Sequence, residues 1–319
     1  MREIKVIDSA RPAKELFEMS RLKNSKPLFW LSVISFAAAL ILIPIRLLDE
    51  QTLDGAPVWD KPLKFFISTA IFALTYSWLS SFLVKGVRLV ASAGWVILIG
   101  MTIELALITG VAATGRNSHF NVSTPLASTI WYTMAAFISI VLIATVVFTI
   151  LILRDKSQKW ELRLGLGLGS MNTAIGMALA FVMTSPTANQ LANSQGIAGA
   201  HSVGVSDGGP GLPFLGWSIV AGDLRVGHFF GLHSIQVAAV LLAIAIALPL
   251  HFRTPLLVVG NMTYLGFIAL VTLQALQAES FSSPSVSTIT SFGILLAIAG
   301  ALFIIWSQVI FRSKSKTNA

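Results

Sequence analysis

The chain has 319 residues, of which 55% are hydrophobic and 11% are charged, and it contains no cysteine. A soluble domain carries about 25% charged residues, so this composition excludes an ordinary soluble protein and predicts a membrane protein. The lack of cysteine excludes disulfides, thiolate metal sites, iron–sulfur clusters and cysteine nucleophiles.

Apolar runs long enough to cross a bilayer, about 20 residues each, follow one another along the chain. We expect eight transmembrane helices near residues 28–48, 63–84, 89–113, 125–153, 161–184, 227–249, 255–278 and 286–310. Runs such as ILIATVVFTILIL lack the alternation of a transmembrane β-strand. The predicted fold class is therefore an all-α membrane protein, an eight-transmembrane-helix bundle.

The 22 lysines and arginines are distributed unevenly along the chain. With both termini in the cytoplasm, most of them fall in the inner loops and terminal segments, as the positive-inside rule requires. Those on the outer side are Arg46, Lys61, Lys64, Arg116 and Arg225. We therefore predict cytoplasmic segments at 1–27 and 312–319 around a membrane domain at 28–311. The net charge of +8 then faces anionic lipid and not nucleic acid.

The phrase WDKPLKF, residues 59–65, predicts the start of the second helix. We expect Asp60 to cap this helix, Pro62 to lie in its first turn and the two lysines to extend toward the outer interface. These lysines face outward, against the positive-inside trend.

Glu104 is the only acidic residue well inside a predicted span. At 1.5 Å per residue it lies roughly 14 Å below the outer face. Because an ionisable side chain inside a membrane is energetically costly, we take Glu104 as a candidate catalytic residue.

The outer segment GRNSHFNVSTP, residues 115–125, ends in a helix-start sequence. That cap does not explain the polar residues before it. We predict that His119 is a metal or haem ligand and that Arg116 and Asn121 bind substrate.

The outer connection at 186–226 is by far the longest of the predicted loops. It is rich in glycine and proline, yet it also contains Trp217 and other apolar residues that a disordered linker would lack. We predict a folded lid over the outer end of the bundle. Within it, His201 is a candidate metal or haem ligand and Asp207 a candidate catalytic carboxylate.

The stretch GDLRVGHFFGLHSIQ, residues 222–236, leads from this lid into the sixth predicted helix. We expect Asp223, a candidate catalytic carboxylate, and Arg225, a candidate substrate-binding residue, to lie in water. His233 lies roughly 10 Å below the outer end of the helix, deep enough to share a cavity with Glu104.

Helical phase separates the two histidines of this stretch. His228 and His233 are five residues apart, or roughly 140° around a straight helix. We therefore assign His233 to the cavity, with Gln236 as a substrate-binding residue on nearly the same face. His228 is expected to contact the lid or the 115–125 segment, and both histidines are candidate metal or haem ligands.

Four phrases resemble those of a group of bacterial multi-pass inner-membrane proteins for which no activity is established: WDKPLKFFIS, SHFN followed by TP, DGGPGLP and GDLRVGHFFGLH. The similarity runs from about Trp59 to Gln236. It implies a multi-pass protein of the bacterial cytoplasmic membrane and implies nothing about a reaction.

Histidine and carboxylate ligands suit Zn, Fe or Cu, and a metal-bound water is a nucleophile near neutral pH. The first hypothesis is therefore a metal-dependent membrane enzyme acting on a lipid-soluble or anionic substrate. Ceramidase-like zinc hydrolases pair their histidines four apart, whereas His228 and His233 are five apart.

Three alternatives remain open. The first is a b-type haem protein that oxidises quinol or lipid, although haem A synthase, which also has eight helices, spreads its axial histidines over several spans. The second is a transporter or permease, and the third is a non-catalytic binding or assembly protein. The sequence does not decide the oligomeric state.

Overall fold

The structure, a computed structural model, describes residues 16–53, 55–193 and 195–317. Its helices are α2 (Met19–Leu22), α3 (Lys26–Leu48), α4 (Asp60–Ser80), α5 (Val87–Ala112), α6 (Pro125–Arg154), α7 (Trp160–Ala178), α8 (Ala180–Thr184), α9 (Ala188–Ala192), α10 (Arg225–Leu232), α11 (Ser234–Ala247), α12 (Leu250–Leu276) and α13 (Val286–Thr317). Two antiparallel pairs of short strands are β1 (Thr52–Leu53) with β2 (Ala56–Pro57), and β3 (Ser202–Val203) with β4 (Gly222–Asp223). Residues 1–15 of the predicted amino-terminal segment and 318–319 of the predicted tail lie outside this description.

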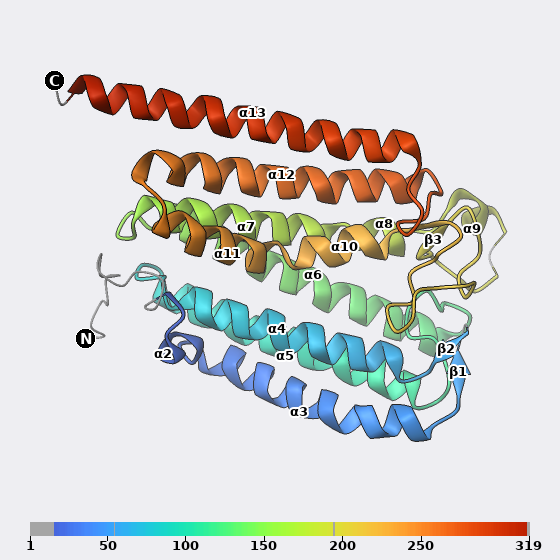
Figure 1. Cartoon of the computed structure of the whole chain (residues 1–319). Helices are drawn as coiled ribbons and strands as arrows, with labels where there is room; N and C mark the ends of the chain where they lie inside the picture. The colour runs from blue at the N-terminus through green and yellow to red at the C-terminus, as the bar shows by residue number, and fades with distance from the viewer. Residues whose placement is uncertain (1–15, 54, 194, 318–319) are drawn as a thin grey trace.

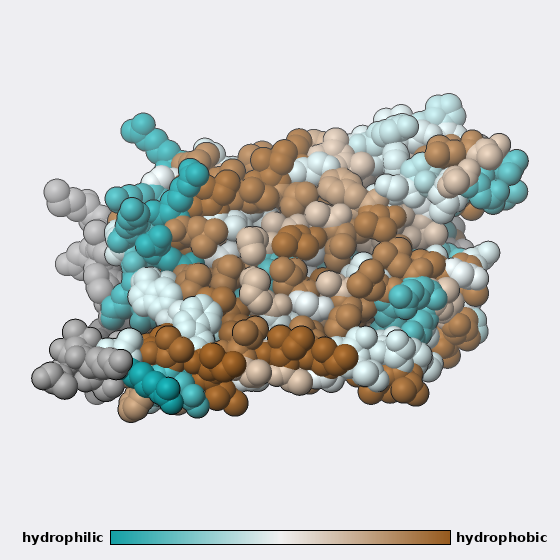
Figure 2. Space-filling view, turned by 90° about the horizontal axis from the view of Figure 1, so that it is seen from above, coloured by the Kyte–Doolittle hydropathy of each residue, from teal (hydrophilic) through white to brown (hydrophobic). Residues whose placement is uncertain are grey.

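Seven of the described helices are long and apolar enough to cross a membrane, and the bent pair α10 and α11 makes eight if it forms one span. Hydrophobic residues cover most of the middle of the face seen in Figure 2, and more hydrophilic residues lie toward its two ends. Helices suit this setting because they satisfy their own backbone hydrogen bonds in lipid. The chain is thus a mostly helical protein with the long apolar helices of a membrane bundle.

The helices form two groups (Figure 1). Helices α3, α4 and α5 pack together in one group, and α7, α10, α11, α12 and α13 form the other. Helix α6 packs against α5 and α7 and so joins the groups, while α13 lies at the edge against α12. Helix α3 begins and α13 ends at one end of the bundle, and the four strands lie at the opposite end (Figure 1), which we call the β end.

The sixth predicted span is not one straight helix. Helix α10 ends at Leu232, α11 begins at Ser234, and their axes differ by 43°. The N–H of Ile235 donates instead to Thr173 Oγ1 of α7, at 3.1 Å. Position 231 requires glycine, because a Cβ added there would lie 2.4 Å from Gly176 Cα. The bend therefore follows from close packing of α10 on α7, which helical periodicity alone does not predict.

The main core fills the bundle on the far side of the bend from the β end. Its largest fully buried side chains include Tyr76, Phe148 and Ile235 from α4, α6 and α11. Tyr76 donates to or accepts from Ser170 Oγ of α7 at 3.1 Å, so the two helix groups are also joined by a polar contact.

The long connection between α8 and α10 is folded. Strands β3 and β4 pair within it, with Ser202 opposite Asp223. Helix α9 begins with a capping box formed by Thr187 and Gln190. Trp217 is buried among aromatic side chains of α10 and α12. The packing of Trp217 and the paired strands thus give this segment a defined structure. That it acts as a lid stays a prediction.

Candidate functional site

A cavity of about 950 Å³ lies between the two helix groups at the β end. Apolar side chains such as Phe72, Met134 and Leu142 form its deep part. The predicted site residues that line it are Glu104, Arg116, His119, His201, Asp207, Arg225, His228, His233 and Gln236. Asn121 and Asp223 are not in the lining: Asn121 Oδ1 instead accepts from the backbone and the hydroxyl of Ser123 in a local turn.

Glu104 and His119 face each other in this cavity. Glu104, on α5, is only 3% exposed, and its Oε1 lies 3.9 Å from Nε2 of His119. Its Oε2 has no hydrogen-bond partner among the described residues. The His119 ring lies between Phe65 and Phe120, and its Nδ1 is 3.2 Å from Ser118 Oγ. Both side chains are held in place, and each keeps hydrogen-bonding capacity that the other does not use.

The His119 imidazole is neutral at pH 7. This residue precedes α6, outside the membrane-spanning helices. Burial lowers the pKa of His119 well below its ordinary value of 6.5, and the positive charge of Lys61 lowers it further. A neutral imidazole keeps one nitrogen lone pair, with which it can accept a proton or bind a metal ion.

His201 and Asp207 form a second pair within the long connection. His201 Nδ1 lies 3.2 Å from Asp207 Oδ2, and the backbone N–H groups of His201 and Ser202 also donate to this carboxylate. Burial raises the pKa of Asp207, but these hydrogen bonds outweigh it and hold the pKa below its ordinary value. Burial also lowers the pKa of His201, which Asp207 offsets only in part. The pair therefore consists of a carboxylate and a neutral imidazole at pH 7.

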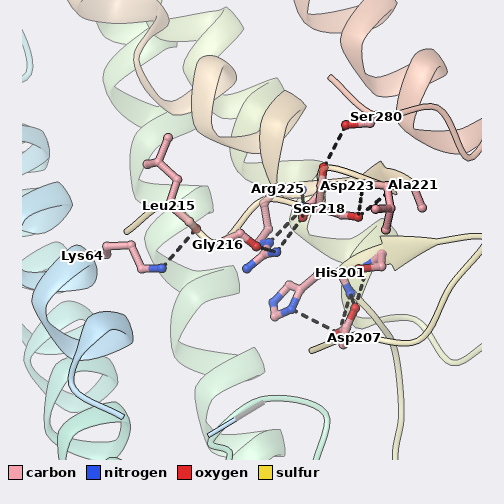
Figure 3. Close-up of polar contacts among 12 residues, drawn as sticks. Lys64, His201, Asp207, Leu215, Gly216, Ser218, Ala221, Asp223, Arg225 and Ser280 are labelled. Atoms are coloured by element: carbon pink, nitrogen blue, oxygen red, sulfur yellow. Dashed lines mark hydrogen bonds and ion pairs between the residues drawn. The ribbon is translucent and has the colours of Figure 1, made fainter. Parts of the chain in front are cut away.

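Asp223 is buried and not in water, contrary to the prediction, whereas the Arg225 side chain is part-buried and lines the cavity. Asp223 is 1% exposed, and its carboxylate accepts from Ser218 N at 2.9 Å and from Arg225 N, Nε and Nη2 at 3.0, 2.9 and 2.6 Å (Figure 3). Arg225 Nη2 also donates to the carbonyl of Gly216. The segment before β4 folds back over the start of α10 and excludes water, which the linear sequence did not reveal. Asp223 does not line the cavity but holds the Arg225 side chain in position there.

The two histidines of α10 and its end both line the cavity, which corrects the separation expected from helical phase. His228 Nδ1 donates to the Gly176 carbonyl of α7 at 2.8 Å. His228 is also near enough to His201 of the long connection and to His119 of the 115–125 segment to interact with both electrostatically, so its contact with the lid or with that segment stays a prediction. Its Nε2 is then the unprotonated nitrogen. His233 packs edge-on against Phe229 at 4.6 Å between ring centroids.

Gln236 lies deeper, on α11. Its Nε2 donates to Thr75 Oγ1 of α4 at 2.9 Å, which links the two helix groups across the cavity. Its Oε1 is buried without a hydrogen-bond partner among the described residues. An unpaired buried acceptor that lines a cavity is available to a ligand donor.

The histidines and carboxylates do not converge on one point. Within the described ranges, no group of three or more His, Asp or Glu side chains is placed to hold a metal ion. Glu104 with His119 and His201 with Asp207 instead form separate pairs. The predicted metal and the predicted haem are therefore left as predictions.

Two lysines of the cavity lining were missed as site residues. The WDKPLKF phrase does start a helix, but its N-cap is Trp59, and Asp60 binds Arg46 of α3 instead of capping. Lys61 and Lys64 line the cavity rather than extending to the interface. The signal available in the sequence was their predicted position on the outer side, where few lysines are expected.

Comparison with known proteins gives no further identification. The chain matches no protein-family profile, and no curated protein and no solved structure shows significant similarity to it. The long apolar helices are those of a membrane-protein-like bundle, and its internal cavity is mostly apolar with a group of charged and polar side chains in the lining. Any more specific assignment depends on the site itself.

Proposed function

We propose that the protein is an integral membrane enzyme that binds an amphiphilic substrate in the cavity and transfers a proton between the substrate head group and the Glu104–His119 pair. The observation that carries this proposal is the buried Glu104 carboxylate, which faces the cavity with one oxygen unpaired within the described chain. Burial of such a group is costly and is typical of functional sites in membrane proteins.

The shape of the cavity supports an amphiphilic substrate. Its deep wall is apolar and suits a hydrocarbon tail, while the histidines and basic side chains gather at the β end, where a polar head group would lie. A cavity of about 950 Å³ is large for a small polar metabolite and within the range of ligand sites of about 300–1,000 Å³.

The geometry of the pair supports proton transfer. At 3.9 Å, Glu104 Oε1 and His119 Nε2 are too far apart for a direct hydrogen bond, so both atoms keep hydrogen-bonding capacity for a reacting oxygen or a water that lies beside them in the cavity. Neutral His119 would act as the base, and Glu104 would stabilise the imidazolium that forms.

We place the protein in the bacterial cytoplasmic membrane with both termini in the cytoplasm and the β end outward. Support comes from the basic residues of the loops opposite the β end and from the resemblance to bacterial inner-membrane proteins. The substrate would then enter from the outer leaflet or the outer surface.

A divalent metal ion, Zn, Fe or Cu, is a possible addition to the same site. Glu104 and His119 would supply two ligands, and water or substrate would supply the others. Elemental analysis of the purified protein tests this version, and an absorbance spectrum with a Soret band would instead indicate haem b and a quinol or lipid partner.

A transporter is the second candidate, because the 43° break between α10 and α11 borders the cavity. Transporters use such broken helices at substrate sites, in corresponding positions of two repeats. The described chain has a single helix pair bent to this degree, so the enzyme is the preferred function.

Turnover of membrane lipid tests the proposal. Purified wild type, Glu104→Gln and His119→Gln proteins would be incubated with a bacterial lipid extract and the products followed by mass spectrometry. We expect a new species with wild type that both variants fail to form, while Glu161→Gln, near Arg253 in the opposite half of the molecule, still forms it. The same species profile for wild type and Glu104→Gln would contradict the proposal.

A further inference from the structure

The basic side chains at the β end of the cavity outnumber the acidic groups that face them. Asp60 binds Arg46, Asp207 binds His201, and Asp223, outside the lining, binds Arg225. Lys61, Lys64 and Arg116 also line the cavity, as does Glu104, so the five lysines and arginines of the lining exceed its three carboxyl groups. The polar part of the site therefore carries excess positive charge, which favours an anionic ligand.

Two of these cations border one small space beside Gly216. A Cβ added to Gly216 would lie 3.5 Å from Arg225 Nη1 and 3.8 Å from Lys64 Nζ. The residue has φ +71°, a conformation suited to glycine, so this position stays without a side chain. Figure 3 shows Lys64 and Arg225 approaching the 215–216 backbone from different sides.

Hydrogen bonds hold both groups in place while leaving donors available. Lys64 Nζ donates to the Leu215 carbonyl at 3.1 Å. Arg225 uses Nε and Nη2 on Asp223 and Gly216, and its Nη1 has no hydrogen bond to the described residues. Asp223 thus fixes the guanidinium so that Nη1 faces the space beside Gly216.

We propose that Lys64 and Arg225 bind the phosphate of a lipid head group, whose acyl chains occupy the apolar part of the cavity. This inference rests on the proposed amphiphile site and names its substrate class. A phosphate has several strong acceptor oxygens, so it can meet Lys64 and Arg225 together while another oxygen faces His201 or Lys61. The apolar part of the lining suits an acyl chain, so the cavity as a whole fits a phospholipid better than free phosphate.

Binding to the delipidated full-length protein in a sugar-based detergent tests this assignment. The probes are phosphatidic acid, diacylglycerol with the same chains, a fatty acid and inorganic phosphate, with affinities measured by native mass spectrometry and thermal shift. We expect phosphatidic acid to bind at least about tenfold more tightly than diacylglycerol or fatty acid. Inorganic phosphate alone is expected to give no thermal shift.

Lysine variants locate the site. Lys64→Gln should weaken phosphatidic acid binding about tenfold, and Lys64→Arg should restore most of it, because one charge-assisted hydrogen bond is lost and regained. Lys85→Gln, at the opposite end of the bundle, serves as the matched control and should leave binding unchanged. Arg225 is not replaced, since it also fixes the segment around Asp223.

The inference would be overturned by equal affinity for phosphatidic acid and diacylglycerol, by no effect of Lys64→Gln, or by stronger binding of the fatty acid. Stabilisation by inorganic phosphate that the acyl chains do not increase would assign the site to the free anion and overturn the lipid assignment. Failure of the proposed enzyme function is separate, because it appears as absent turnover while Lys64-dependent lipid binding persists.

Discussion

Glu104 Oε1 and His119 Nε2 lie 3.9 Å apart, although one residue belongs to α5 and the other to the connection before α6. The connection brings His119 back over the end of α5, and Phe65 and Phe120 hold its ring there. The result is a carboxyl group and a neutral imidazole that share one cavity. We therefore expect that replacing Glu104 affects the activity and the stability of the protein differently.

Glu104→Gln should abolish turnover without lowering stability. Glutamine has nearly the same shape, and replacing a buried carboxylate by a neutral amide removes the cost of burying charge. We expect an unchanged or higher melting temperature together with a loss of turnover of about 100-fold or more, because the imidazolium that forms on His119 would lose the charge that stabilises it. Thermal unfolding and the product assay are measured on the same preparation. A variant that melts earlier and is also inactive would assign Glu104 a structural role.

Asp223→Ala should strongly destabilise the protein. It would remove the acceptor of three Arg225 donors and of the Ser218 N–H, and leave the guanidinium without its counter-charge. Breaking a buried ion pair in this way costs about 3–5 kcal/mol. Reversible unfolding in detergent mixtures gives the free energy, with exposed Glu50→Gln as the control. A loss below about 1 kcal/mol would show that this ion pair is not needed for folding.

Gly231→Ala should separate α10 from α7. The added Cβ would lie 2.4 Å from Gly176 Cα, so the backbones must move apart. Overpacking of this kind costs about 1–3 kcal/mol. Gly293→Ala on α13 is the matched control, because its Cβ would meet no described atom within 4 Å. Equal melting temperatures for the two variants would argue against close packing at the bend.

Acidification should destabilise the long connection through His201. The unfolded chain takes up a proton at this residue near pH 6.5, whereas burial delays protonation in the folded protein to lower pH. The unfolded state therefore binds more protons in this interval, and stability falls as the pH drops below about 6.5. Asp207, whose pKa is also lowered, adds a loss in the same direction below its ordinary value of 3.8.

Hydrogen exchange of residues 199–209 measures this effect. We expect faster exchange at about pH 5.5 than at about pH 7.5, after correction for the intrinsic rate, and a flatter pH dependence in His201→Gln. Slower corrected exchange on acidification would mean that a protonated His201 strengthens its contact with Asp207, which is the opposite sign.

The sequence predicts the helical class well because lipid imposes long apolar helices. Each apolar run contains a helix in the structure, and the cap of α6 at Thr124 lies where the STP sequence predicts it. The bend at His233 depends on contacts between Gly231, Gly176 and Thr173, residues of different helices. Such contacts leave no periodic pattern in one helix.

The candidate site was predictable only in its general location. Glu104 and His233 were expected to share one outer cavity from depth arguments, and the structure places both in one lining together with His119. The burial of Asp223 and the inward position of Lys64 depend on how the segment before β4 folds back, which local sequence does not determine. Charge position relative to the membrane was the useful signal for Lys64, since it departed from the general rule.

A high-resolution cryo-electron microscopy map of the protein in nanodiscs of native lipid tests the central claim most directly. The claim predicts elongated density in the cavity, with its polar end within about 3.5 Å of the Glu104–His119 pair or of Lys64 and Arg225, and its tail along α4 and α11. A cavity that contains only isolated water-sized features, with lipid confined to the outer surface of the helices, would contradict it.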